Sequence, residues 1–147
     1  MRALIQRVKE AHVTVDQKVI GKINQGILLL LGIHKDDDES KIPYLVEKVD
    51  ALRIFEDSAG KMNLSLDDIG GKLLIVSQFT LYGECKKGRR PSFINTMKPS
   101  DACFLYESFV QKAKEKIGES RIETGSFGAE MQIHLLNDGP VTFLLSR

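Results

Sequence analysis

Apolar residues alternate with polar ones, or run together, in several short segments that predict strands. Residues 2–8 are expected to form the first strand, and residues 12–15 and 18–20 a hairpin across Asp16-Gln17. From Gly26 to Ile33 the chain is almost wholly apolar, which is typical of a strand buried on both faces. Later segments with strand-like patterns are Arg53–Phe55, Leu73–Thr80, Arg121–Glu123, Met131–Leu136 and Val141–Ser146.

Helical spacing of apolar residues appears in two segments. The first helix is expected to begin near Ser40, because Pro43 fits a helix only in its first turn. Its apolar face would consist of Ile42, Leu45, Val46, Val49 and Leu52. The second helix is expected from Asp101 to Ile117, with Gly118 as its stop signal.

The segment Asn137-Asp138-Gly139-Pro140 separates the last two predicted strands. Because these are the usual residues of turns, the local pattern predicts a β-hairpin turn. Residues 82–99 contain few apolar residues and are expected to form a long loop, which is often functional. About eight strands and two helices, with hairpins early and late, predict an α+β fold. A single domain is expected to span residues 1–147.

Composition narrows the class of protein. The chain has 147 residues, of which 42% are hydrophobic and 28% charged, the balance of a globular protein. Its formal net charge is only +1, so any contact with RNA must come from a local patch, and no DNA partner is expected. Cys85 and Cys103 are too few for a disulfide framework, and no signal segment opens the chain. The longest apolar run, Ile27–Leu31, is too short to cross a bilayer, so a cytoplasmic protein without a membrane partner is expected.

Ser77 and Thr80 are the natural candidates for a nucleophile. The G-x-S-x-G elbow of many hydrolases is absent around Ser77, and no base lies near either hydroxyl in the sequence. An esterase acting on a small ester through one of these hydroxyls nevertheless stays open. The histidines show no metal-ligand spacing, and the acidic run 36–39 is explained by helix capping. No metal and no cofactor are therefore expected.

One basic cluster stands out. Lys86, Lys87, Arg89 and Arg90 lie within five consecutive residues. Such a cluster can be a solvated loop, or it can bind phosphates by releasing counterions from RNA. A non-catalytic RNA-binding module is therefore a second open alternative.

Three segments together resemble the D-aminoacyl-tRNA deacylases: Ser77–Leu81, Gly125–Ala129 and Asn137–Thr142. The likeness covers essentially the whole chain. It implies curved, mostly antiparallel sheets arranged like a barrel, two main helices covering one side, and a homodimer. It also implies hydrolysis of the ester between a D-amino acid and the tRNA 3′ end, which is a form of translation quality control.

The resemblance also assigns roles to residues. The backbone N–H groups of Phe79 and Thr80 would stabilise the oxyanion, with Ser77 and Gln78 in the same active-site segment. The pair Gly139-Pro140, with a cis peptide bond and braced by Arg7, would enter the partner's pocket as a wedge against L-residues. Glycine has no side chain for the wedge to meet, so glycyl-tRNA would be a substrate as well.

Overall fold

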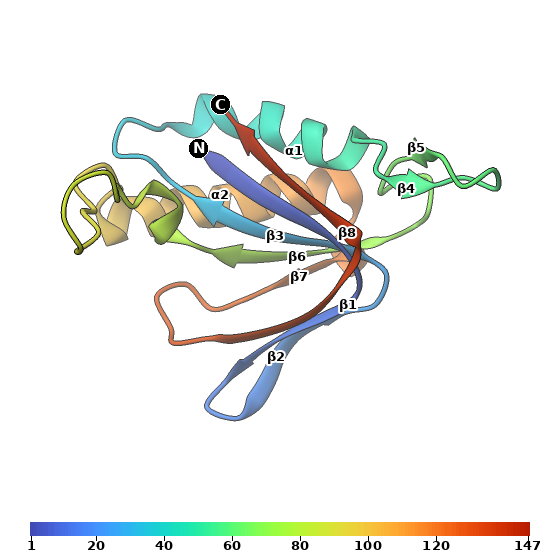
Figure 1. Ribbon diagram of the computed structural model, residues 1–147, viewed down its shortest axis with the longest axis horizontal. Coiled ribbons are helices and arrows are strands. Elements are labelled where there is room, and N and C mark those ends of the chain that lie inside the picture. Colours follow the sequence, from blue (N-terminus) through green and yellow to red (C-terminus); the bar gives the residue numbers. More distant parts are fainter.

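A six-stranded mixed sheet, curled nearly into a barrel, organises the computed structural model, which describes residues 1–147 (Figure 1). The strand order is β2-β1-β3-β6-β7, and β8 pairs with β1. The bounds are β1 Arg2–Val15, β2 Lys18–Ile23, β3 Gly26–Gly32, β6 Lys72–Ser77, β7 Ile122–Thr124 and β8 Gln132–Ser146. A small separate hairpin is formed by β4 (Phe55–Glu56) and β5 (Met62–Leu64).

Two helices cover the outer face of this sheet, as Figure 1 shows, in agreement with the predicted α+β class. The helices are α1 (Ile42–Ala51) and α2 (Pro99–Ile117), and short 3-10 helices lie at η1 (Glu39–Lys41), η2 (Phe79–Tyr82) and η3 (Glu119–Arg121). Neither α-helix combines the length and the apolar character that a membrane span requires.

Strand β1 holds the sheet together because it has three partners, all antiparallel. Its first half pairs with β3 and its second half with β2, while β8 runs along the other edge of both halves. The remaining pairs, β3 with β6 and β6 with β7, are parallel. Residues 2–15 thus form one strand instead of the two predicted segments, and Asp16 and Gln17 make the expected turn with φ of 47° and 62°.

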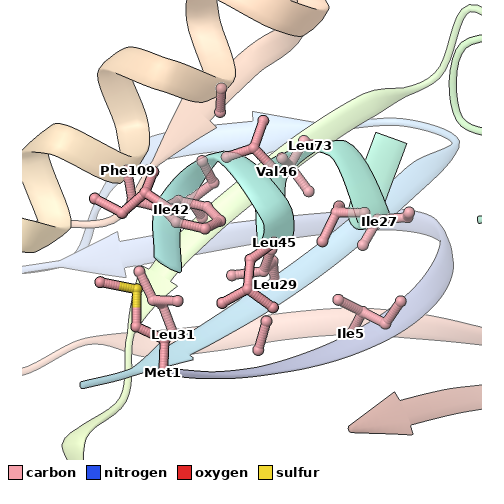
Figure 2. Packing of buried hydrophobic residues seen from close by; sticks show 14 of the residues in the cluster. Met1, Ile5, Ile27, Leu29, Leu31, Ile42, Leu45, Val46, Leu73 and Phe109 are labelled. Atoms are coloured by element: carbon pink, nitrogen blue, oxygen red, sulfur yellow. The ribbon is translucent and has the colours of Figure 1, made fainter. Parts of the chain in front are cut away.

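The core has two parts, one on each face of β3 and β6. Ile27, Leu29 and Leu31 face the helices, where Figure 2 shows Leu45 of α1 and Phe109 of α2 near them. The alternate residues of the two strands, with apolar residues of β1 and β2, fill the inside of the barrel; this second cluster is Val8, Ala11, Val13, Ile23, Leu28, Leu74 and Val76. Side chains of successive residues point to opposite faces of a sheet, so both faces require apolar residues. The unbroken run predicted as a doubly buried strand is confirmed.

Both helices begin and end for local reasons. The Asp38 carboxylate accepts a hydrogen bond from Ser40 N ahead of α1, and Pro43 lies in its first turn as expected. Helix α2 begins two residues earlier than predicted, at Pro99, and ends before Gly118, whose φ of 109° favours glycine. The predicted strand 73–80 is too long: β6 ends at Ser77, and the chain turns into η2.

The predicted hairpin turn at residues 137–140 is wrong. Residues 132–146 form one strand, β8, both halves of which pair with β1. The turn-type residues form a bulge within this strand, since Val8 pairs with Asn137 and Gln6 with Thr142, leaving residues 138–141 opposite Arg7 alone. Sequence pattern could not distinguish the two outcomes, because the choice depends on the length of the distant strand β1.

Candidate active site

A cavity of about 510 Å³ lies at the carboxyl ends of the parallel strands β3 and β6. Ligand sites in sheets with parallel strands commonly occupy this end. Ten of its 15 lining residues are hydrophobic. They are Leu31, Ile33, Val76, Ser77, Gln78, Phe79, Thr96, Met97, Pro99, Ala102, Phe127, Gly128, Ala129, Met131 and Ile133.

The turn after β6 brings main-chain donors to this cavity. Gln78 N donates to the carbonyl of Leu31 at 2.7 Å, and Leu81 N donates to the carbonyl of Gln78 at 3.3 Å to open η2. The N–H groups of Phe79 and Thr80 precede that first helical bond, so they have no partner within the turn. Of the four residues predicted for the active site, Ser77, Gln78 and Phe79 line the cavity, whereas Thr80 does not.

Two contacts hold η2 in place. The Arg2 guanidinium donates to the carbonyl of Leu81 at 2.7 Å. Gly32 allows η2 to lie close to β3, because a Cβ there would be 2.9 Å from Leu81 Cβ and 3.1 Å from the Gln78 carbonyl oxygen. The donors of η2 therefore rest on a fixed support, which catalysis by fixed dipoles requires.

The polar side chains in the cavity wall are Ser77, Gln78 and Thr96. The Gln78 amide donates to the Thr80 hydroxyl at 2.6 Å, so it is oriented within η2 itself. No group of three or more His, Cys, Asp or Glu side chains is placed to hold a metal ion. The wall thus offers a ligand amide, hydroxyl and main-chain hydrogen bonds within an apolar surrounding.

The predicted basic cluster lies on an exposed loop next to η2, at the left of Figure 1. The main chains of Glu84 and Ser92 exchange two hydrogen bonds, at 2.8 and 3.0 Å, and close the loop at its base. The tip, residues 85–91, carries all four cations, Lys86, Lys87, Arg89 and Arg90, and all four are exposed. We call residues 85–91 the basic tip.

The bulge of β8 exposes Gly139 and Pro140, whose peptide bond is cis, as predicted. Arg7, only 4% exposed, braces it: Nε donates to the Asp138 carbonyl oxygen at 3.2 Å and lies 3.1 Å from the Asp138 carboxylate. Its Nη1 donates to the carbonyl of Ile54 at 2.7 Å, which ties the bulge to the residue that precedes β4. The structure therefore places the three residues of the predicted wedge together.

Asn137 also supports the bulge, although the sequence suggested only a turn residue. Oriented by its hydrogen bonds, its amide nitrogen donates to the carbonyls of Arg7 and Val141, and its oxygen accepts from the side chains of Thr142 and Gln6. An Asn two residues before a Gly-Pro pair was the available signal. The sequence pattern does not mark the cavity residues of β3 and α2 as site residues, because apolar residues at these positions are equally typical of a hydrophobic core.

The bulge and the cavity lie apart along β8. Ile133 lines the cavity, and Gly139 lies six residues further along β8, a length of up to about 20 Å at 3.3 Å per residue. A chain therefore cannot place its own bulge in its own cavity.

Comparison with known proteins gives the class of this protein. The family model described as D-Tyr-tRNA(Tyr) deacylase matches residues 4–146, so the chain is of the hydrolase class that acts on aminoacyl-tRNA esters. The chain belongs to this family, which confirms the resemblance.

Individual relatives agree with the family match. D-aminoacyl-tRNA deacylases of Thermosipho africanus (strain TCF52B) and Clostridioides difficile (strain 630) are 59% and 57% identical, each over 99% of this chain and 96% of the relative. A solved structure named c-Myc DNA Unwinding Element Binding Protein is 41% identical with a TM-score of 0.94, covering 100% of this chain and 99% of that one. A structure described as a probable eukaryotic D-amino acid tRNA deacylase shares the fold, with a TM-score of 0.87 at 20% identity over 98% of this chain and 97% of that one.

Proposed function

We propose that this chain hydrolyses the ester bond of D-aminoacyl-tRNA and releases the free amino acid and the tRNA. The observation that carries the proposal is the family match over residues 4–146, with relatives of this activity at 57–59% identity over nearly the whole chain. A tRNA substrate makes the cytoplasm the expected location.

The chemistry proposed is main-chain catalysis at η2. An aminoacyl ester placed in the cavity would direct its carbonyl oxygen at the N–H groups of Phe79 and Thr80. When water adds to that carbonyl, negative charge develops on the oxygen, and a single fixed donor of this kind typically contributes about 2.7–4 kcal/mol. Ser77 and Gln78 would position the ester, with no covalent intermediate on the protein.

Rejection of L-residues is assigned to the bulge. The D- and L-enantiomers of an amino acid carry the same atoms, so discrimination requires a steric obstacle that only the L-enantiomer meets. Main chain held by Arg7 and Asn137 suits this role, because it cannot rotate away as a side chain can. Gly139 and Pro140 would meet the side chain of an L-residue, while that of a D-residue would point elsewhere. Glycine would pass, so glycyl-tRNA would be hydrolysed too.

This role requires a second copy of the chain. The bulge lies up to about 20 Å from its own cavity along β8, so it would enter the cavity of a partner. Strand β8 pairs with β1 alone, which leaves its other edge unpaired. Apolar side chains beside that edge are exposed: Leu135, Leu136, Phe143 and Leu144. Such an edge is normally covered, and a symmetric homodimer would cover it.

The basic tip would bind phosphates of the tRNA. Its four cations are exposed beside η2, whereas the chain as a whole has a net charge of +1. Attraction to RNA would thus be concentrated at the cavity end of the molecule.

Incubation with matched D-, L- and glycyl-tRNA tests the proposal. We expect loss of the ester from the D- and glycyl-forms and little from the L-form. A trapped acyl-enzyme would favour the alternative of a serine or threonine esterase. Tight tRNA binding without ester loss would favour a non-catalytic RNA-binding module.

A further inference from the structure

An exposed apolar platform lies between the cavity and the basic tip. The rings of Phe79 and Phe93 meet edge to face, with centroids 5.0 Å apart and an angle of 61°. Phe79 is 57% exposed, Phe93 38% and the following Ile94 75%. We call these three residues the platform; exposed apolar groups gathered in this way commonly mark a binding surface.

Short contacts fix Phe93 against η2. A Cβ on Gly83, the residue after η2, would lie 3.1 Å from the Phe93 ring, so a larger residue there would push the ring back by a few tenths of an ångström. The carbonyl of Phe93 accepts hydrogen bonds from Thr96 N at 3.0 Å and from the Thr96 hydroxyl at 2.7 Å. Phe79 and Thr96 both line the cavity, so the platform is attached to the cavity rim.

The charges around the platform indicate the chemistry of its ligand. Phe93 follows the basic tip by two residues, and a groove with cations beside aromatic faces is the usual site for single-stranded nucleic acid. Phe104 of α2 is equally exposed, at 57%, but it lies in a hollow that is acidic on balance, with three glutamates against the single cation of Lys112. A polyanion would therefore favour the platform over Phe104.

We propose that the platform stacks the base of the nucleotide that precedes the terminal adenosine in the unpaired 3′ end of tRNA. The inference rests on the proposed function, in which the terminal nucleotide carries its ester into the cavity. The chain of the RNA must then leave over the rim at Phe79, which brings the preceding base to Phe93 and Ile94. Its phosphates would continue toward the basic tip.

Two substrates of different length test this role. Phe93→Ala should lower kcat/KM for D-aminoacyl-tRNA, relative to kcat/KM for D-aminoacyl-adenosine, by about 5- to 150-fold. Phe93→Trp should restore the ratio, and Phe104→Ala is the matched control that should leave it unchanged. An unchanged ratio in Phe93→Ala overturns the proposal.

The base itself can also be removed. A tRNA with an abasic penultimate nucleotide should be a poorer substrate for the wild-type protein by a similar factor. The same change should have little further effect on Phe93→Ala, because the stacking partner is already absent. A wild-type protein that does not respond to the missing base contradicts the platform.

A binding measurement separates this inference from the proposed function. We consider a short RNA that carries no amino acid and has 2-aminopurine before its terminal adenosine. The fluorescence of the 2-aminopurine should fall when this RNA binds to the wild type or to Phe93→Trp, but not when it binds to Phe93→Ala. Quenching without hydrolysis of any aminoacyl ester would support the platform and refute the deacylase. Hydrolysis without quenching would do the reverse.

Discussion

The hydroxyls of Ser77 and Thr80 lie in the segment whose main-chain N–H groups we propose as the catalytic donors. Ser77 lines the cavity, and the Thr80 hydroxyl is the acceptor of the Gln78 amide. Neither observation makes the hydroxyl a nucleophile, since activation would require a base in hydrogen-bond reach.

We therefore expect Ser77→Ala and Thr80→Ala each to retain measurable deacylation of D-aminoacyl-tRNA, within about 100-fold of wild type. Single-turnover rates measure this directly. A drop of about a million-fold in either variant, the size seen when a true nucleophile is removed, would revive the covalent mechanism.

Arg7 connects the bulge to the rest of the fold through a fork that lysine cannot reproduce. Arg7→Lys should lower the ratio of D- to L-aminoacyl-tRNA hydrolysis by about tenfold or more, equal to about 1.4 kcal/mol, because the obstacle becomes mobile. Arg53→Lys is the matched control, since Arg53 is exposed and bonds only to the Asn63 side chain, at 3.5 Å. An Arg7→Lys enzyme of normal selectivity would show that the guanidinium does not support discrimination.

Asp50 of α1 is a buried carboxyl group that lacks a full set of hydrogen-bond partners. Its Oδ1 is buried without a hydrogen-bond partner, and its Oδ2 lies 3.9 Å from the Lys116 ammonium. Burial, assisted by the charge of Asp67, raises the pKa of the Asp50 carboxyl. A raised pKa means that the folded state binds the proton more tightly, so stability is greatest below the unfolded pKa of about 3.9 and is lost as pH rises through the folded pKa.

Asp50→Asn should consequently be at least as stable as wild type at pH 7. Most point substitutions instead lower the free energy of unfolding by about 0.5–3 kcal/mol. Urea unfolding at pH 7 and below pH 4 would measure the difference, which should shift in favour of wild type at the acidic pH. A variant less stable at pH 7 by the same amount as at acidic pH would show that the carboxylate charge has no such effect.

Among the elements, the basic tip is the one for which we propose a role that depends on charge alone. Replacing Lys86, Lys87, Arg89 and Arg90 by glutamine should weaken binding of every tRNA alike. The slope of log K against log salt should flatten by up to about 3–4, since each phosphate contact contributes about 0.7–0.9. Four exposed lysines elsewhere serve as the control set: Lys18, Lys22, Lys48 and Lys112. An unchanged slope in the loop variant would reduce the tip to a solvated loop.

The elements show what the sequence could and could not predict. The Gly26–Gly32 strand followed from an unbroken apolar run, and both helices followed from the helical spacing of their apolar residues. Strand β8 did not, because a bulge and a hairpin use the same residues and differ only in pairing with β1. The motif residues Ser77–Phe79 were predicted for the site and line the cavity, but its walls from β3 and α2 depend on tertiary packing that no local pattern encodes.

At the scale of the whole molecule, the unpaired edge of β8 predicts association. Sedimentation at micromolar concentration should show a dimer. The double variant Leu136→Glu with Leu144→Glu should be a folded monomer without selective activity, because it places charges at the two most exposed leucines of β8, each 53% exposed. Val19→Glu, at a residue of β2 that is 56% exposed, is the control. A wild-type monomer with full activity and selectivity would contradict the cross-subunit wedge.

Strand β8 also sets where the chain can gain or lose residues. Segments rich in Asn, Asp, Gly and Pro normally tolerate insertions and deletions, because they lie at loop tips. Residues 138–141 cannot, since Asn137 and Thr142 are both held in register on β1. A deletion there must either shorten the bulge or slip the last half-strand by one residue, which would turn Val141 and Leu145 away from the core. The basic tip, closed by its own pair of hydrogen bonds at Glu84 and Ser92, is instead free to vary in length.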